Sequence, residues 1–311
     1  MAKTIRDAYG ESLLKYGKDN PDVVALDADV ASSTKSSIFG KECPDRFFNM
    51  GIAEANMVGV AAGLAASGKI PFINTFAVFL TSIGLIGARA FGSYSGLNMK
   101  FMGAYGGISD SYDGPSHHSL EDIAIMRTLP GFEVFVPSDE VQTDWLVKHA
   151  IETKGPMYIR LSRDATADVY APGTAFAPGR GMVVREGADA AIIACGVMVG
   201  QALQAAEELS RKGIEVRVVD MFSIKPIDRE LILDCAAKAG LVVTAEEHNV
   251  IGGLGGAVAE VLSAAGSSVP QRFIGTNDCH TECGPYGGLL QRYCLDAAAI
   301  AKTVESALNG K

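Results

Sequence analysis

The sequence has no run of basic residues and no uninterrupted apolar segment of membrane-spanning length. Its 311 residues carry 27 Lys and Arg against 36 Asp and Glu, a formal net charge of -9, which argues against nucleic acid or an anionic membrane surface as the main partner. The longest apolar stretch, residues 76–88, is interrupted by Thr and Ser, and charges occupy the N-terminus where a signal peptide needs apolar residues. We therefore expect no membrane association and a cytoplasmic protein that binds small molecules or other proteins.

Cysteine is also scarce, with six residues in the whole chain. So few cysteines in a chain of this length do not make a disulfide framework, and we expect reduced thiols. One cluster, Cys279-His280-Thr281-Glu282-Cys283, contains residue types that bind zinc, but no second pair at ligand spacing accompanies it. We interpret this segment as a loop and expect no metal site in the chain itself.

Short strand-like apolar runs alternate with longer helical segments. In the first half, the segments 23–26, 70–75 and 100–104 are expected as strands, and a helix is expected over 79–93. The alternation returns in the second half. The pattern predicts an α/β fold of two βαβ domains with mainly parallel sheets, each covered by helices on both faces.

Pro and Gly are densest between residues 170 and 181, as expected for a linker between two domains. We expect a first domain over residues 1–170, a linker over 171–187 and a second domain over 188–311. The composition, 48% hydrophobic and 20% charged, is that of a globular chain.

One carboxylate stands at the start of an apolar helical segment. Over residues 55–66 the one strongly polar side chain is Asn56, and frequent Gly and Ala let other backbones approach closely, so we expect this helix to be buried on all sides. Glu54, at its start, needs a partner. Two interpretations stay open: a capping side chain for the first-turn N–H groups, or a functional carboxylate.

A polar, glycine-rich loop over residues 106–118 ends in two histidines. It has the features of a functional loop. Histidine is the side chain best suited to proton exchange near neutral pH, although only one of His117 and His118 can easily face a site. Asp113 is a candidate to orient His117 or to bind a hydroxyl. Anchoring of the loop is the alternative role for the histidines.

Two arginines, Arg160 and Arg163, lie at the carboxyl end of the last strand of the first half. The forked donors of a guanidinium at this edge suit a phosphate or a sulfonate. An ion pair at the domain interface is an equal alternative for Arg160 and a weaker one for Arg163. Phe76 and Phe79 follow another strand, where they either join the core or stack on a flat heterocycle.

The glycines of residues 252–256 follow a strand and precede a helix, but Val258 stands where a dinucleotide-binding motif requires Gly or Ala. We therefore reject a nicotinamide cofactor. Glu246, Glu247 and His248 just before them are either catalytic by position or a solvated pair of carboxylates with a capping histidine.

Together these segments resemble the carboxyl-terminal two-thirds of transketolase and of deoxyxylulose-phosphate synthase. The resemblance covers essentially the whole chain and implies a pyrimidine-binding domain of a thiamine-diphosphate enzyme followed by the transketolase C-terminal domain. Its most specific motifs, in the family's order, are Gly51-Ile52-Ala53-Glu54, Thr75-Phe76-Ala77-Val78-Phe79, Asp113-Gly114-Pro115-Ser116-His117 and Leu161-Ser162-Arg163.

The resemblance implies the cofactor thiamine diphosphate with Mg²⁺, which supplies the carbanion chemistry while the protein supplies orientation and electrostatics. It gives Glu54 the role of binding the aminopyrimidine N1′, and His117 a second catalytic role together with hydroxyl binding. The other implied cofactor contacts are Asp29, Ile52, Phe76 and Phe79. The implied substrate contacts are Ser33, Tyr105, Asp113, His117 and Arg163, with Ser33 and Arg163 at the terminal anion.

The chain departs from the family pattern in the donor pocket and in one missing motif. Tyr105 stands where the family has a histidine, and Ser82 stands where it usually has an aromatic residue. The diphosphate and Mg²⁺ motif, Gly-Asp-Gly followed later by Asn, does not occur. We therefore expect the pyrimidine-side subunit of a split transketolase, built on a homodimer in an α2β2 assembly, whose N-terminal partner subunit carries that motif and most of the Mg²⁺ contacts.

The expected reaction moves a two-carbon ketol unit from a phosphorylated or sulfonated ketose to an aldose. The alternatives are the β subunit of a 2-oxoacid dehydrogenase, an enzyme like deoxyxylulose-phosphate synthase, and a catalytically silent binding module. The loop from Asp113 to His117 and Arg163 favour sugar substrates over an oxoacid. Glu54, His117 and Arg163 together argue against a silent module, and the identity of the ketose and aldose stays open.

Overall fold

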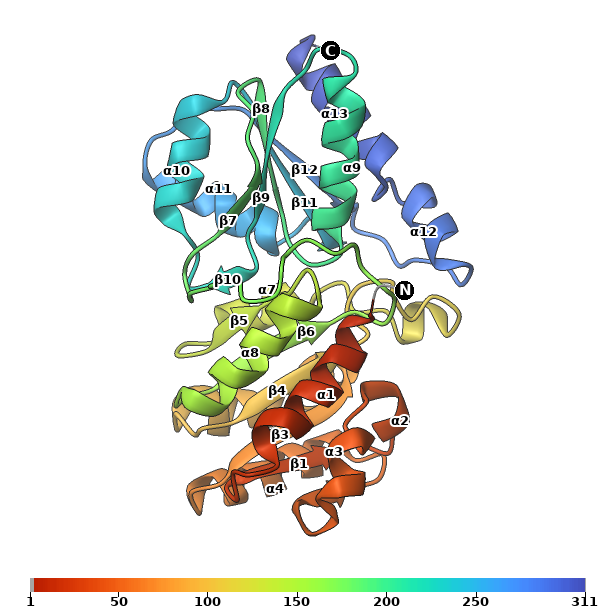
Figure 1. Cartoon of the computed structure of the whole chain (residues 1–311), viewed down its shortest axis with the longest axis vertical. Coiled ribbons are helices and arrows are strands. Elements are labelled where there is room, and N and C mark those ends of the chain that lie inside the picture. The colour runs from red at the N-terminus through yellow and green to blue at the C-terminus, as the bar shows by residue number, and fades with distance from the viewer. Residues whose placement is uncertain (1–2, 311) are drawn as a thin grey trace.

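The structure, a computed structural model, describes residues 3–310. It contains two β-sheets that follow one another along the long axis of the molecule, and helices lie on both faces of each sheet (Figure 1). The predicted α/β fold with two mainly parallel sheets is confirmed.

The first sheet has seven strands. They are β1 (Val23–Asp27), β2 (Phe47–Asn49), β3 (Ile70–Phe76), β4 (Lys100–Ala104), β5 (Glu133–Phe135), β6 (Met157–Leu161) and β10 (Ser223–Lys225). Their order is β10-β5-β6-β4-β3-β1-β2, and all neighbours are parallel except β10, which runs antiparallel to β5. Strand β10 comes from the second half of the chain and so joins the two halves.

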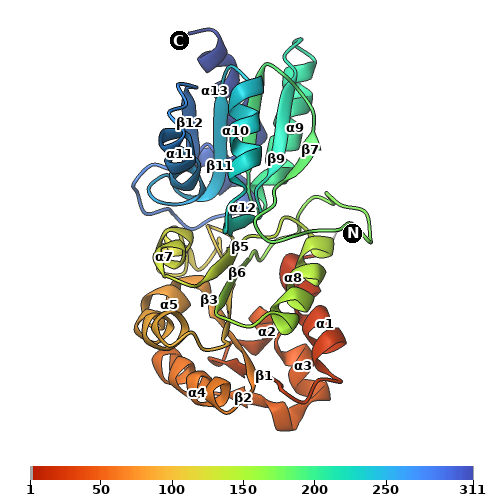
Figure 2. The same cartoon turned by 90° about the vertical axis from the view of Figure 1, so that its left-hand side faces the viewer.

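The helices of the first half form two layers. They are α1 (Ile5–Gly17), α2 (Ala31–Thr34), α3 (Ser37–Glu42), α4 (Glu54–Ala66), α5 (Ala77–Ser82), α6 (Leu85–Gly87), α7 (Asp122–Thr128) and α8 (Glu140–Glu152), with 3-10 turns at Pro44–Arg46 and Gly114–Ser116 and a π-helical segment at Ala88–Tyr94. Figure 2 shows α1, α3 and α8 on one face of the sheet and α4, α5 and α7 on the other.

The expectation of one continuous helix over residues 79–93 is wrong, because the structure divides this stretch into α5, α6 and the π-helical segment. The hydroxyls of Thr81 and Ser82 donate to the carbonyl oxygens of Ala77 and Val78, four residues earlier. Such bonds compete with the regular helix ladder and bend a helix, and α5 ends at Ser82.

The second sheet has five strands: β7 (Met182–Arg185), β8 (Ala190–Ala194), β9 (Val216–Asp220), β11 (Val242–Asn249) and β12 (Gln271–Thr276). Their order is β12-β11-β8-β9-β7, with β7 antiparallel to β9. The helices around them are α9 (Met198–Ser210), α10 (Arg229–Lys238), α11 (Leu254–Ala264), α12 (Tyr286–Arg292) and α13 (Ala297–Leu308). In Figure 1, α9 and α13 lie on one face of this sheet and α10 and α11 on the other. Strand β7 falls within residues 171–187, and the domain boundaries stay a prediction.

Burial explains the apolar runs in the strands. Every residue of β1, β4, β6, β8 and β9 is buried, because the helical layers cover both faces of each parallel sheet. All six cysteines are free thiols. No group of three metal-binding side chains occurs within residues 3–310, and no helix there has the length and apolarity to cross a membrane.

The expectation that the helix after Glu54 is buried on all sides is wrong for the single chain. Met57, Val58 and Ala61 of α4 are buried against the sheet, but the opposite side of the helix is exposed. A helix that is apolar on all sides needs other protein surface on each of them, and this chain covers only one side of α4. The exposed apolar face, as we call it, comprises Ile52 (84% exposed), Val60, Ile83, Ile86 (83%), Phe91 and Tyr94 (91%).

A buried ion pair of the first half lies at the junction with the second half, and its arginine also bonds across that junction. The Arg160 guanidinium lies 2.9 Å from Asp122 through its Nε and donates from Nη2 to the carbonyl oxygens of Ser119 and Glu247, at 3.0 and 2.8 Å. Glu247 belongs to the second half, so the domain-interface interpretation of Arg160 is confirmed.

A second buried carboxylate lies at the same junction. Oδ2 of Asp220, at the end of β9, accepts hydrogen bonds from Ser138 Oγ at 2.9 Å, Gln142 Nε2 at 3.0 Å and Tyr170 OH at 2.7 Å. Its other oxygen has no partner within the described chain. Burial outweighs these bonds and raises the pKa of Asp220 to about 7.

Asp220 is therefore predicted to reduce stability as the pH rises. Its pKa is higher in the folded chain than its ordinary value of 3.8, so the folded state binds more protons between that value and about 7, and the free energy of unfolding falls through this window. Asp220→Asn lacks this titration. In urea unfolding at about pH 5 and about pH 8, the variant should gain stability relative to the wild type at the higher pH. A constant difference between the two proteins would contradict the prediction.

Candidate functional site

The carboxyl ends of β1, β3, β4 and β6 meet at one edge of the first sheet, where parallel α/β folds bind ligands. Residues at or just after these strand ends are Asp29, Phe76, Tyr105 and Arg163. The sheet therefore brings together side chains that are far apart in the sequence.

Four predicted residues form a cluster of rings at this edge. Tyr105 stacks on Phe76 with ring centres 4.6 Å apart and planes 14° apart. His117 meets Phe76 and Phe79 edge-on, at 5.8 and 5.2 Å. Phe76 and Tyr105 are 7% and 4% exposed, and Phe79 and His117 are partly exposed, so the cluster presents an apolar wall with an imidazole at its rim.

Glu54 lies buried beside this wall. It is 4% exposed, and Thr75 Oγ1, one residue before Phe76, donates to its Oε1 at 3.3 Å. In the part of the chain that the structure describes, no first-turn backbone N–H donates to the Glu54 carboxylate, so the interpretation of Glu54 as a capping residue is wrong. Within residues 3–310, Thr75 is its one side-chain hydrogen-bond partner, which leaves a buried carboxylate able to accept a further donor.

The sequence analysis missed Arg6, which lies in the first turn of α1. Its Nη1 donates to the Ser33 carbonyl oxygen at 3.1 Å and to the Tyr105 hydroxyl. The guanidinium carbons of Arg6 and Arg163 lie 5.3 and 5.4 Å from the centre of the Tyr105 ring. Two cations therefore flank one phenol ring next to Ser33. Arg6 belongs to no motif, and its partners lie 27 and 99 residues away, so no local signal marks it.

Arg163 is only partly available to a ligand, because it pairs with an acid that the sequence analysis also missed. Its Nη1 lies 2.8 Å from Oδ1 of Asp110, which is fully buried, while the Arg163 side chain is 33% exposed. Burial raises the pKa of Asp110 to about 6, the nearby Asp113 adds to this rise, and Arg163 opposes it.

The two histidines have different environments. His118 is buried, with Nδ1 hydrogen-bonded to Thr281 Oγ1 of the second half and Nε2 to the Asp110 carbonyl at 3.1 Å. Burial lowers the pKa of His118, so it anchors the loop as a neutral ring. His117 belongs to the ring cluster, so of the two histidines only His117 faces the site.

Three further predicted residues, Asp29, Ile52 and Asp113, also lie outside the ring cluster. Asp29 accepts a hydrogen bond from Asn49 Nδ2 at 2.8 Å, and Ile52 and Asp113 are exposed. Within residues 3–310, no hydrogen bond joins Asp29 or Ile52 to the ring cluster.

The expectation of a solvated carboxylate pair at Glu246 and Glu247 is wrong, because both are buried. Glu246 accepts from the backbone N–H groups of Leu254 and Gly255, at 2.7 and 2.8 Å, and so caps α11. A Cβ on Gly253 would lie 2.0 Å from Glu246 Oε2, so this glycine makes the approach possible. Glu247 Oε1 accepts from Ile108 N at 3.0 Å and holds the start of the 106–118 loop.

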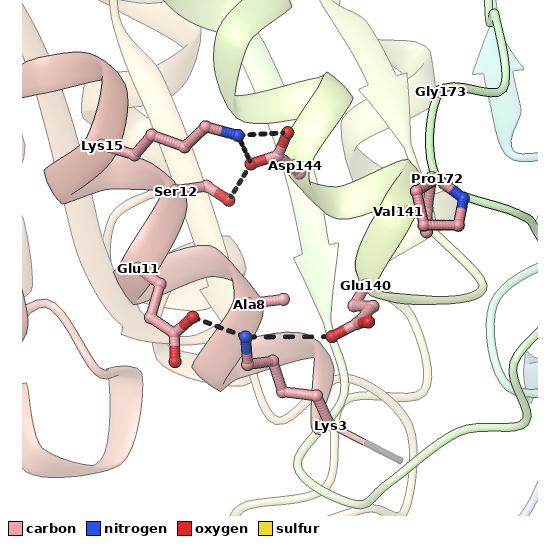
Figure 3. A pocket seen from close by; sticks show the side chains of 10 residues that line it. All are labelled: Lys3, Ala8, Glu11, Ser12, Lys15, Glu140, Val141, Asp144, Pro172 and Gly173. Carbon is pink, nitrogen blue, oxygen red and sulfur yellow. Dashed lines mark hydrogen bonds and ion pairs between the residues drawn. The ribbon is translucent and has the colours of Figure 1, made fainter.

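A cavity of about 430 Å³ lies away from this edge, between α1 and α8 (Figure 3). Its charged side chains pair with one another: Lys15 lies 3.0 Å from Asp144, and Lys3 pairs with Glu11. Lys3 also lies 3.9 Å from Glu140, so both lysines that Figure 3 draws are paired with carboxylates, and we do not assign the cavity a function.

Comparison with known proteins gives two family matches. Residues 1–168 match the family described as transketolase, pyrimidine binding domain, and residues 179–300 match transketolase, C-terminal domain. The chain belongs to the transketolase family. A relative named as a transketolase C-terminal section, from Methanocaldococcus jannaschii, is 42% identical over 97% of this chain and 95% of its own length.

Other members of the transketolase family match over the same range. A 6-deoxy-6-sulfo-D-fructose transketolase subunit from a Clostridium species is 40% identical over 99% of this chain and 95% of its own length. A solved structure described as a split gene transketolase, inactive beta4 tetramer, is 48% identical with a TM-score of 0.89 and covers 99% of both chains. By contrast, the chain spans about half of human transketolase, 48% of its length at 40% identity.

Proposed function

We propose that this chain is one subunit of a heteromeric transketolase that uses thiamine diphosphate to transfer a two-carbon ketol unit from a ketose to an aldose. The observation that carries the proposal is the single sheet edge that holds a buried free carboxylate, an aromatic wall with His117, and two guanidinium groups. Relatives named as transketolase subunits, of similar length to this chain, support it.

The residues present fit the pyrimidine half of the cofactor. Glu54 is a buried carboxylate with one hydrogen-bond partner at 3.3 Å, so a protonated ring nitrogen would complete its hydrogen bonding. Phe76 and Phe79, with ring centres 6.0 Å apart, offer apolar faces to a flat heterocycle. When bound, thiamine diphosphate supplies the nucleophile and the electron sink for breaking and making carbon–carbon bonds.

The protein residues then bind, orient and move protons. Glu54 would hold the pyrimidine N1′ by accepting its hydrogen bond, and this favours the tautomer whose exocyclic nitrogen is a base. His117, at the rim of the ring wall, and Asp113, on the same loop, would bind the ketose hydroxyls, and His117 is able to exchange a proton with them. Arg6, Arg163 and Ser33 would hold the terminal anion and so fix the sugar relative to the wall.

The other half of the site would come from a partner subunit. The sequence lacks the Gly-Asp-Gly…Asn motif that holds the diphosphate and Mg²⁺ in this family, so the proposal assigns these to an N-terminal subunit. The exposed apolar face leaves six large apolar side chains in water, among them Ile52 and Val60, and we infer that subunits cover it in an α2β2 assembly.

A 2-oxoacid dehydrogenase β subunit is the second candidate, since it shares the two-domain plan. The pair of guanidiniums around Tyr105 favours a sugar with a terminal anion over a short oxoacid, which has no such group at its far end. A lipoyl acceptor in place of an aldose would decide for the dehydrogenase.

We predict that Glu54→Gln slows exchange of the cofactor C2 proton by orders of magnitude in the assembled enzyme. Glutamine keeps the shape but removes the charged acceptor that sustains the basic tautomer. Exchange is measured by quenched flow in D₂O with proton NMR. Glu152→Gln, at the exposed end of α8, is the matched control and should exchange at the wild-type rate. Equal exchange rates in Glu54→Gln and Glu152→Gln would show that Glu54 does not have this role.

We predict that Arg6→Ala raises KM for a phosphorylated ketose about 10- to 100-fold, the loss of one charged hydrogen bond. KM for the same ketose without its phosphate should stay near the wild-type value. Arg185→Ala, in β7 of the second sheet, changes the chain charge equally and should alter neither constant. A similar rise for both sugars would mean that Arg6 only supports the fold.

The chain is predicted to be inactive alone. With thiamine diphosphate, Mg²⁺, ketose and aldose, it should show no ketol transfer until a subunit bearing the Gly-Asp-Gly…Asn motif is added. A chromatographic assay of the two sugar products, with each subunit alone and with both, tests this. Turnover by the lone chain at the rate of the mixture would refute the split-subunit proposal.

A further inference from the structure

We propose that Asp110 is a specificity-determining residue, whose carboxylate against Arg163 makes the anion site favour a singly charged terminal group, such as a sulfonate, over a doubly charged phosphate. The inference rests on the proposed function, because it concerns the substrate of the same site. It goes beyond that function by naming the charge of the group that the site accepts.

The charges around Tyr105 are the first observation. Arg6 and Arg163 flank the ring, but Oδ1 of Asp110 lies 2.8 Å from Nη1 of Arg163. Asp164 follows Arg163 directly in the chain, and both guanidiniums lower the pKa of its carboxyl, although burial has the larger effect and raises it. Lys35 adds no free cation, because it lies 3.0 Å from Asp7. Asp113 also lies near enough to raise the pKa of Asp110, so at least two carboxylates stand against the two guanidinium charges.

The position of Asp110 is built into the fold. Its backbone carbonyl accepts from Gly114 N at 3.2 Å and from the buried His118 ring, whose other nitrogen bonds to Thr281 of the second half. The Asp110 side chain is fully buried, and its Oδ2 has no hydrogen-bond partner within residues 3–310. A fixed carboxylate of this kind cannot turn away from an anion that Arg163 binds.

The consequence for binding follows from Coulomb's law. An anion bound by Arg163 lies within about 6–8 Å of Asp110, where each added negative charge on the ligand changes its relative affinity by about fivefold to tenfold at an intermediate dielectric. The pKa of Asp110, about 6, leaves it ionised at about pH 8, where a phosphate monoester carries two charges and a sulfonate one.

The test compares two small anions on the full chain at about pH 8. Methyl phosphate is the doubly charged probe and methanesulfonate the singly charged one, and binding is measured by NMR titration of the arginine side-chain resonances. In Asp110→Asn, which keeps the shape, the ratio of phosphate affinity to sulfonate affinity should rise about fivefold to tenfold over the wild type. Asp144→Asn, between α1 and α8, changes the chain charge equally and should leave the ratio unchanged.

The possible outcomes each decide the proposal. An unchanged ratio, an equal loss of both affinities, or no binding of either probe by the wild type would overturn it. If Asp110→Asn does not fold, as judged by its circular dichroism, Asp110→Ser is measured by the same criteria. Ketol transfer in the assembled enzyme is assayed separately with a phosphorylated and a sulfonated ketose. A shifted ratio without any transfer would contradict the proposed function alone, whereas transfer without a shifted ratio would contradict only the role of Asp110.

Discussion

The buried guanidinium of Arg160 is the constraint on which the arrangement of the site depends. It pairs with Asp122 of the first half and bonds to the carbonyl oxygens of Ser119 and Glu247. The Glu247 side chain in turn accepts from Ile108 N. These bonds fix both ends of the loop that carries Asp113 and His117, and one of the anchors comes from the second half. The second half therefore has a part in the site although it supplies none of the predicted site residues. Removing one member of such a pair leaves a buried charge without a partner, which costs about 3–5 kcal/mol.

The exposed apolar face includes Val60 of helix α4, the helix that begins at the buried Glu54. A carboxylate at the end of an apolar helix is stable when it has a donor, and the exposed side of that helix is stable when it is covered. One chain meets neither need completely, since Thr75 is the one side-chain partner of Glu54 within residues 3–310 and Ile52 is 84% exposed. Both needs are met if a partner subunit brings the remaining half of the cofactor site onto this face.

The sequence was sufficient for the fold class and for the residues that lie at strand ends. Apolar runs at β1 and β4 predicted a parallel sheet, and Phe76, Tyr105 and Arg163 lie at or just after the ends of strands that pairing brings to one edge. The sequence did not predict contacts between distant segments. Tertiary packing, which no local pattern encodes, determines the positions of Arg6 and Asp110 and the burial of Glu246. The helix after Glu54 was misjudged for a related reason, because an apolar sequence specifies that a surface is covered but not whether the same chain covers it.

If this chain holds half of a site shared between subunits, cofactor binding should depend on the presence of both subunits. Isothermal titration of thiamine diphosphate with Mg²⁺ into the chain alone, into the N-terminal partner alone and into their mixture measures the affinity of each. We expect tight binding in the mixture, at least about 100-fold stronger than in either subunit alone, since each would hold a separate part of the ligand. Binding by this chain alone with the affinity of the mixture would contradict it.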